Sequence, residues 1–234
     1  MHLSLDGTGF ALFGLGFALG VRHALDPDHL IAVSTIVSRS KSIARSSVAG
    51  AVWGVGHTAS LFVCGSIVLA LRLQIPDSFV GAAERAVAIM LVLLGINAMW
   101  RAITHSRLHF HFHTHDGRRH AHFHAHPSTA ASTHDHSHRL NVGFRPFWIG
   151  MVHGLAGTGA LMVVVIAAAP SFLAGSIYIL MFGLGSIGGM LILSSLISIP
   201  FVLSARFFGV VNQGLQFVTA SLSIALGLFW ISAA

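Results

Sequence analysis

The sequence predicts an all-α integral membrane protein with six transmembrane helices arranged as a 3+3 inverted repeat. Three observations lead to this fold class: high apolar content, hydrophobic runs of membrane-spanning length, and a similarity between the two halves of the chain. Of the 234 residues, 54% are apolar and 9% are charged, and the mean hydropathy is +0.79. A helix of about 20 apolar residues crosses the hydrocarbon core of a bilayer. The predicted spans are residues 8–37, 48–71, 79–103, 145–168, 172–199 and 208–232.

The two halves align at an offset of about 130 residues. LGVRHALDPDHLIAV of the first span matches IGMVHGLAGTGALMV of the fourth, and WGVGHTASL of the second resembles FGLGSIGGM of the fifth. Because each half has an odd number of spans, the second half is expected to be inverted, as in secondary transporters with a substrate site near the midplane. The alternative is chance similarity among glycine-rich apolar helices. The matched residues are Gly20 with Gly150, His23 with His153, Leu25 with Leu155, Gly54 with Gly183, Gly56 with Gly185, and Leu94-Gly95 with Leu226-Gly227.

Lysine and arginine residues predict the orientation of the spans. Ten of them fall in or beside the loops on one side, whereas Arg72 and Arg85 fall on the other. By the positive-inside rule, both termini are expected outside the cytoplasm of a multi-pass protein of the cell (inner or plasma) membrane. Basic loops that face anionic lipid explain the net charge of +6, so no nucleic-acid partner is expected. The ten residues are Arg39, Lys41, Arg45, Arg101, Arg107, Arg118, Arg119, Arg139, Arg145 and Arg206.

This topology divides the chain into three regions. Residues 1–103 form the first three-helix repeat with the metal motifs, residues 104–142 a His-rich cytoplasmic loop, and residues 143–234 the second three-helix repeat. The loop holds twelve of the seventeen histidines. With little apolar mass it is expected to be unfolded, and His-rich tracts of this kind bind metals. We expect a metal buffer or sensor on the cytoplasmic face; the alternative is a solvated linker.

The first predicted span contains five ionisable residues within the stretch GVRHALDPDHLIAV, namely Arg22, His23, Asp26, Asp28 and His29. An ionised carboxylate within a span costs several kcal/mol unless it is paired, hydrated or bound to a cation, so these residues are functional candidates. Imidazole and carboxylate together suit a divalent first-row metal such as Ni, Co, Zn or Cu. The alternative is an ion pair between Arg22 and Asp26, one helical turn apart.

Pro27 is expected to interrupt the helix at this point. On an ideal helix His23, Asp26 and His29 share an arc of about 120°, whereas Asp28 points to the far side. Proline cannot donate to the His23 carbonyl, and it biases the preceding residue away from helical geometry. An opened turn is expected to bring Asp28 to the same side and to free the His23 carbonyl to face a cavity.

A further imidazole source is His57, which lies between small residues in WGVGHTASL. Gly54 and Gly56 allow another backbone to approach closely. We interpret His57 as a metal ligand; alone, it would more often be a core histidine. Thr58 either orients it or bonds its own helix backbone. His153 has no acidic partners in its own motif, so core packing or a gate is expected of it rather than ligation.

These motifs resemble the signature of a known family. RHALDPDHLIAV, in which four residues separate His23 from Asp28 and His29, is similar to the signature of the nickel/cobalt transporter (NiCoT) family, and GHTAS resembles that family's second Gly-His motif. The resemblance covers roughly residues 15–65 and is nearest to the urease-cluster branch of nickel permeases. It implies Ni²⁺ or Co²⁺ transport, with His23, Asp28, His29 and His57 as binding and selectivity residues.

The chain also departs from that family. Family members usually have eight spans, and their acidic motif of the second half is replaced here by HGLAGTGAL, with Gly157 where an aspartate is expected. A His-rich loop occurs in related nickel/cobalt efflux proteins. Efflux is therefore the alternative to uptake.

The N-terminus offers an additional chelate. Met1-His2 combines an α-amine, a backbone nitrogen and an imidazole, and it resembles the amino-terminal nickel site of energy-coupling-factor metal-uptake components. The alternative is a frayed terminus without a ligand role.

Together these features predict a permease that moves Ni²⁺, with Co²⁺ as a second substrate, into the cell. Other classes considered are a metal-capturing component of a multi-subunit importer and a membrane metalloenzyme. An enzyme is not expected, because the chain has no H-E-x-x-H box and its single glutamate is Glu84. No cofactor is expected; the expected partners are the divalent ion, the lipid bilayer and cytoplasmic metallochaperones. The predicted metal-site residues are His23, Asp28, His29, His57, Asp26 and His2.

Overall fold

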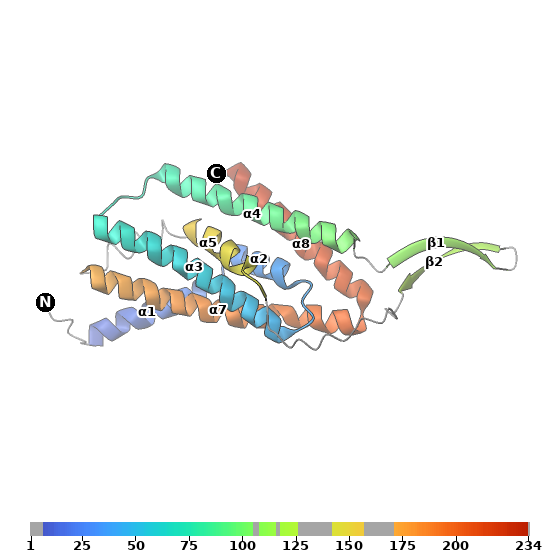
Figure 1. Ribbon diagram of the computed structural model, residues 1–234, viewed down its shortest axis with the longest axis horizontal. Coiled ribbons are helices and arrows are strands. Elements are labelled where there is room, and N and C mark those ends of the chain that lie inside the picture. The colour runs from blue at the N-terminus through green and yellow to red at the C-terminus, as the bar shows by residue number, and fades with distance from the viewer. Residues whose placement is uncertain (1–6, 105–107, 116–117, 126–141, 157–170, 234) are drawn as a thin grey trace.

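The polypeptide forms a bundle of long helices from which a two-stranded ribbon projects (Figure 1). The computed structural model describes residues 7–104, 108–115, 118–125, 142–156 and 171–233. Within these ranges the elements are α1 (Gly7–His23), α2 (Pro27–Val37), α3 (Ile43–Leu71), α4 (Asp77–Thr104), β1 (Leu108–His115), β2 (Arg118–Ala125), α5 (Arg145–Ala156), α7 (Phe172–Phe207) and α8 (Gly209–Ala233).

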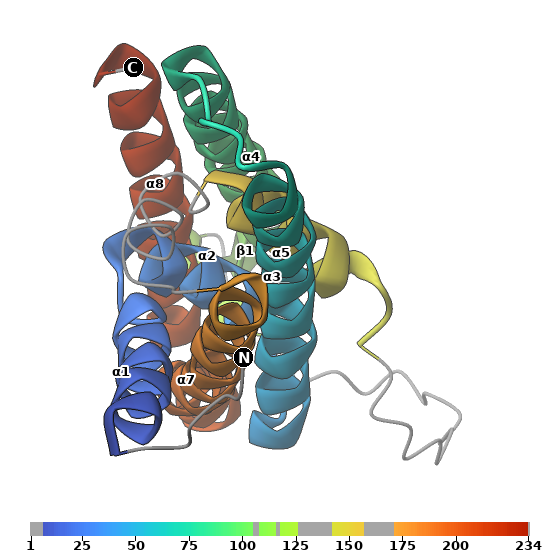
Figure 2. The ribbon, with the colours of Figure 1, turned by 90° about the vertical axis from the view of Figure 1, so that its left-hand side faces the viewer.

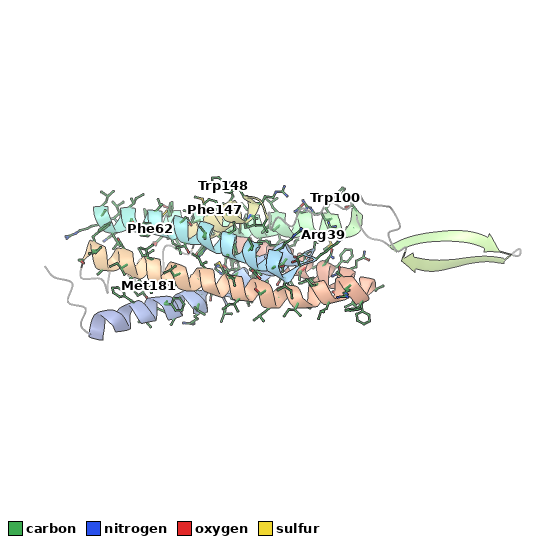
Figure 3. The ribbon with its side chains drawn as sticks, turned by 60° about the horizontal axis from the view of Figure 1, so that its bottom comes forward. Arg39, Phe62, Trp100, Phe147, Trp148 and Met181 are labelled. Carbon is green, nitrogen blue, oxygen red and sulfur yellow. The ribbon has the colours of Figure 1, made fainter. Side chains whose placement is uncertain are left out.

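Four of these helices, α3, α4, α7 and α8, are long and apolar enough to cross a membrane. Their outward positions carry large apolar side chains, and the exposed Trp100 and Trp148 point away from the bundle (Figure 3). The chain is therefore a helical membrane protein. Four predicted spans fall on these helices, but α3 begins at Ile43 rather than at 48 and α7 continues to Phe207 rather than ending at 199. The first predicted span is divided into α1 and α2. The fourth is described as α5 as far as Ala156, and its remainder lies outside the described residues.

Serine caps fix where two of the long helices begin. The hydroxyl of Ser42 accepts a hydrogen bond from the Arg45 N–H at the start of α3. Ser171 likewise accepts one from the Ala174 N–H, 3.3 Å away, at the start of α7. Each cap satisfies a backbone donor that has no partner in the first turn of its helix.

Helices α3 and α7 run side by side at the centre of the bundle (Figure 2). Helix α1 packs against α7, α5 packs against α3, and α4 pairs with α8. The short helix α2 lies among these long helices in both views (Figures 1 and 2). This arrangement surrounds the end of α1 and the start of α2 with helices from both halves of the chain.

Several glycines allow close approaches between helices, and two of them lie at crossings beside the α1–α2 break and His57. A Cβ atom on Gly20 of α1 would lie 2.9 Å from the backbone nitrogen of Ser186 in α7. A Cβ atom on Gly150 of α5 would lie 2.9 Å from the backbone nitrogen of His57 in α3. Glycine is thus required at both crossings, as small residues are at many helix contacts in membranes.

The His-rich segment differs from the unfolded loop that composition led us to expect. Strands β1 and β2 pair antiparallel, from Leu108 opposite Ala125 to His115 opposite Arg118. The reason is the strict alternation of histidine with apolar residues in LHFHFH, which has the two-residue period of a strand. Residues 126–141 lie outside the described residues.

Candidate metal centre

The interruption predicted near Pro27 is present and begins the candidate site. Helix α1 ends at His23, and α2 begins at Pro27 after Asp26, whose backbone is extended at φ −62° and ψ 146°. Proline suits the first position of a helix because its missing N–H would have no partner there. The break therefore follows from one residue and its effect on the preceding backbone.

The predicted release of the His23 carbonyl is wrong. Asp26 N–H donates to this carbonyl across a tight turn, with an N–O distance of 3.0 Å. The turn replaces the hydrogen bond that proline cannot make, so no backbone oxygen is freed for the cavity at this residue. Asp28 does turn towards the histidines, as expected, since its carboxylate contacts His29 and His153.

Four histidines from four helices converge at the break. His23 ends α1, His29 lies in the first turn of α2, His57 is in α3 and His153 is in α5. Ring centroids are 4.5 Å apart for His23 and His29, 4.3 Å for His29 and His153, and 5.2 Å for His57 from both His23 and His29. His29, His57 and His153 are only 1%, 0% and 2% exposed.

Two carboxylates hold three of these rings. Nδ1 of His23 lies 2.7 Å from Oδ2 of Asp26. Asp28 accepts from two histidines, with Nδ1 of His29 3.2 Å from its Oδ1 and Nε2 of His153 2.7 Å from its Oδ2. A carboxylate that accepts from one ring nitrogen fixes the orientation of the ring and leaves the other nitrogen to bind a metal.

Several buried ring nitrogens lack partners among the residues that the structure describes. They are Nε2 of His29, both nitrogens of His57 and Nδ1 of His153. A buried polar atom without a hydrogen bond is costly, and most such atoms in proteins are satisfied. Coordination of a cation would satisfy nitrogens that the protein itself leaves unpaired.

The potential ligands form two overlapping groups of three. One is His23, His29 and His57; the other is Asp28, His29 and His153; within each, the ligand atoms lie within 4.8 Å of one another. Metal–nitrogen bonds of about 2.1 Å place opposite ligands about 4.2 Å apart, so a small contraction closes either group on one ion. Imidazoles with one carboxylate suit Ni²⁺, Co²⁺, Zn²⁺ or Cu²⁺.

The centre lies near the middle of the bundle and borders a cavity. His57 is the central residue of the 29 in α3, about 21 Å from either end at 1.5 Å per residue. The adjoining cavity has a volume of about 120 Å³. Its lining residues are His23, Asp28, His29, Glu84, His153, Ala156 and Trp230.

The structure brings together four of the predicted site residues: His23, Asp28, His29 and His57. Asp26 belongs to neither group of three and contacts His23 from one side. The sixth, His2, lies outside the described residues.

Two of the alternatives left by the sequence are also decided. The described partner of Asp26 is His23 rather than the exposed Arg22. Thr58 neither orients His57 nor bonds its own helix, because its hydroxyl donates to the Gly183 carbonyl of α7 at 3.2 Å.

His153 is the residue that sequence reasoning left out of the ligand set. It was expected to pack in the core or act as a gate, yet its imidazole contacts Asp28 and lies beside His29. The motif around His153 contains no acidic residue; its acidic partner, Asp28, comes from α2 in the other half of the chain. The available signal was its alignment with His23 in the repeat.

Comparison with known proteins identifies relatives of the whole chain. The chain is 36% identical to the urease accessory protein UreH of Bacillus sp. (strain TB-90) over 226 residues, which cover 94% of this chain and 90% of that protein. It is 28% and 26% identical to the chloroplast proteins FOR GROWTH AND FERTILITY 1 and 2 of Arabidopsis thaliana, over 75% of this chain but only 46% and 44% of those proteins. No family model and no solved structure matches. The extent of the first similarity shows that the chain belongs to the family of the urease accessory protein UreH.

Proposed function

We propose that this protein carries Ni²⁺, and Co²⁺ as a second substrate, across the cell membrane through the centre of His23, Asp28, His29 and His57. The observation that supports this most is the set of unpartnered histidine nitrogens in the middle of a membrane bundle. Ionisable groups at that depth are expensive and typically line the path of an ion. His153 joins the centre through Asp28.

The choice of metal is supported by two similarities. A relative named as a urease accessory protein is consistent with nickel handling. The motifs RHALDPDHLIAV and GHTAS resemble those of the NiCoT family, whose members transport Ni²⁺ or Co²⁺. The imidazole-rich ligand set agrees with both metals, but it also accepts Zn²⁺ and Cu²⁺.

The arrangement proposed is six spans in a 3+3 inverted repeat, with α1 and α2 together as one broken span. Equivalent contacts in the two halves support it. Helix α1 packs on α7 as α5 packs on α3. A Cβ on Gly56 would meet the carbonyl of Phe147, and one on Gly185 would meet that of Phe17. These pairs differ by about 130 residues, the offset of the sequence repeat.

Uptake is the direction we favour, with both termini outside and the His-rich region inside the cell. An inside-negative potential supplies about 2.3 kcal/mol per charge per 100 mV, hence roughly twice that for a divalent ion. Metal would pass from Met1-His2 to the central histidines and then to the His-rich region and cytoplasmic metallochaperones. The competing functions are efflux, metal capture for separate energising subunits, and a membrane metalloenzyme.

Transport by the purified protein alone tests the proposal. Vesicles containing only this chain should accumulate radioactive Ni²⁺ under an inside-negative potential, because no second subunit is required. His23→Ala, Asp28→Ala, His29→Ala and His57→Ala should each abolish accumulation while retaining the elution profile and melting temperature of a folded protein. Asp77→Ala, at the exposed start of α4, is the control and should transport normally. Normal uptake by two or more of the four variants contradicts the proposal.

A further inference from the structure

A second carboxylate, besides that of Asp28, lines the cavity beside the histidines. Glu84 of α4 and Trp230 of α8 line it together with His23, Asp28 and His153. The volume of about 120 Å³ is several times the roughly 10–15 Å³ that one water requires. Glu84 therefore shares with the imidazoles a space that can hold a cation together with some of its water.

The cavity extends towards the end of the bundle that is opposite the ribbon. Glu84 lies seven residues after the start of α4, about 10 Å along the helix, and Trp230 lies three residues before the end of α8. These two helix ends meet, since the C-terminus lies beside the start of α4 while β1 and β2 project from the other end (Figure 1). The cavity thus leads from the central histidines towards one face of the membrane.

The Glu84 side chain is exposed in the structure, at the open edge of the cavity. Among the described residues no ion pair and no side-chain hydrogen bond involves its carboxylate. The neighbouring Arg85 directs its guanidinium towards Gly81, one turn earlier, and does not line the cavity. A carboxylate within an apolar span is costly unless it is hydrated, paired or bound to a cation.

We infer that Glu84 forms an outer binding position for a partly hydrated divalent metal ion, which the ion occupies before the histidines coordinate it. A carboxylate oxygen is a hard ligand that binds cations retaining several waters, whereas imidazole is the better ligand for the dehydrated first-row metal. Glu84 at the cavity edge and the buried imidazoles deeper inside therefore suit successive stages of dehydration. This inference rests on the transport function proposed above.

The test compares Glu84→Gln with Arg85→Gln in vesicles, with the initial rate of Ni²⁺ uptake measured over a range of concentrations. Glu84→Gln should raise the KM for Ni²⁺ about tenfold with little change in the maximal rate. It removes one negative charge from a hydrated site but leaves the central histidine ligands in place. Glu84→Asp keeps the negative charge, so its KM should lie close to that of the wild type. Arg85→Gln should have the KM of the wild type. Mg²⁺, a hard cation, should compete with Ni²⁺ in the wild type and less so in Glu84→Gln.

The outcomes separate this inference from the proposed function. If the wild type transports Ni²⁺ and folded Glu84→Gln has an unchanged KM, the outer position is wrong and the central site stands. A fall in maximal rate alone, without rescue by Glu84→Asp, also overturns it, because that pattern indicates a structural role. If the wild type carries no Ni²⁺ in these vesicles, the transport function itself fails.

Discussion

His153 and Asp28 join the two halves of the chain at the centre of the bundle. Nε2 of His153 in α5 lies 2.7 Å from Oδ2 of Asp28 in α2, 125 residues earlier in the sequence. Both side chains are largely buried, at 2% and 14% exposed. The first half supplies the other three histidines, so this contact makes the second half part of the candidate metal centre.

Removing the His153 imidazole should therefore weaken metal binding. In His153→Ala, Oδ2 of Asp28 loses its partner and one of the two groups of three loses a ligand. We expect Ni²⁺ affinity to fall about 10–100-fold, as it does when a ligand or its orienting partner is removed. Calorimetric titration measures this. Ser223→Ala, which removes a buried hydroxyl between α8 and α4, is the control and should leave affinity unchanged; equal affinities for His153→Ala and wild type would return His153 to a packing role.

Replacing Pro27 should lower metal affinity without lowering the stability of the protein. In Pro27→Ala, residue 27 gains an N–H for the His23 carbonyl, and α1 can continue into α2 as one helix. We expect stability to rise or stay level. Ni²⁺ affinity should fall by about as much as it does when one ligand is removed, because Asp28 turns away from His153. Pro200→Ala, within α7, is the matched control and should not change affinity. Unchanged affinity in a well-folded Pro27→Ala protein would show that the break is not needed.

The approach of α5 to α3 should depend on Gly150. A methyl group in Gly150→Ala would press on the backbone of α3 at Trp53 and His57. We expect a loss of about 1–3 kcal/mol in stability from this overpacking. Gly188→Ala in α7 is the control, because a Cβ there meets nothing within 4 Å. Thermal unfolding in detergent should show a lower Tm for Gly150→Ala only; equal Tm values would mean that the helices are not in close contact there.

The ribbon should be dispensable for the bundle. Deletion of residues 109–138 removes most of β1 and all of β2, which pair with each other, and it removes none of the described helices. Tm and basal transport should be preserved, whereas the amount of metal bound per protein should fall because the deleted segment is rich in histidine. Mass-spectrometric metal analysis of both proteins checks this. Complete loss of transport would place the segment in the conduction path.

Features of the fold that depend on nearby residues in the sequence could be predicted, whereas features that depend on contacts between helices could not. The extents of α4 and α8 follow from hydropathy alone, and the break follows from Pro27, so the sequence sufficed for both. The hydrogen bond from Asp26 N–H to the His23 carbonyl could not be predicted from ideal-helix geometry, which contains no such turn.

The contribution of His153 was not predictable for a different reason. It requires α5 to cross α3 at Gly150 in one rotational setting, so that the imidazole meets Asp28 from the other half. Repeat alignment shows which residues correspond, but not which helices meet. The choice of Asp26 between Arg22 and His23 is of the same kind, because both lie about one helical turn away.

Because His29 belongs to both groups of three, the two groups compete for one ring. A neutral imidazole carries a proton on one nitrogen and offers a single lone pair from the other, so His29 can serve only one ion at a time. In the proposed transporter, occupancy of the two groups would therefore be mutually exclusive, and the bundle centre would take up one ion per chain. A transported ion that shifts from His23 and His57 towards Asp28 and His153 would remain attached to His29 throughout, exchanging its other ligands without being fully released within the membrane.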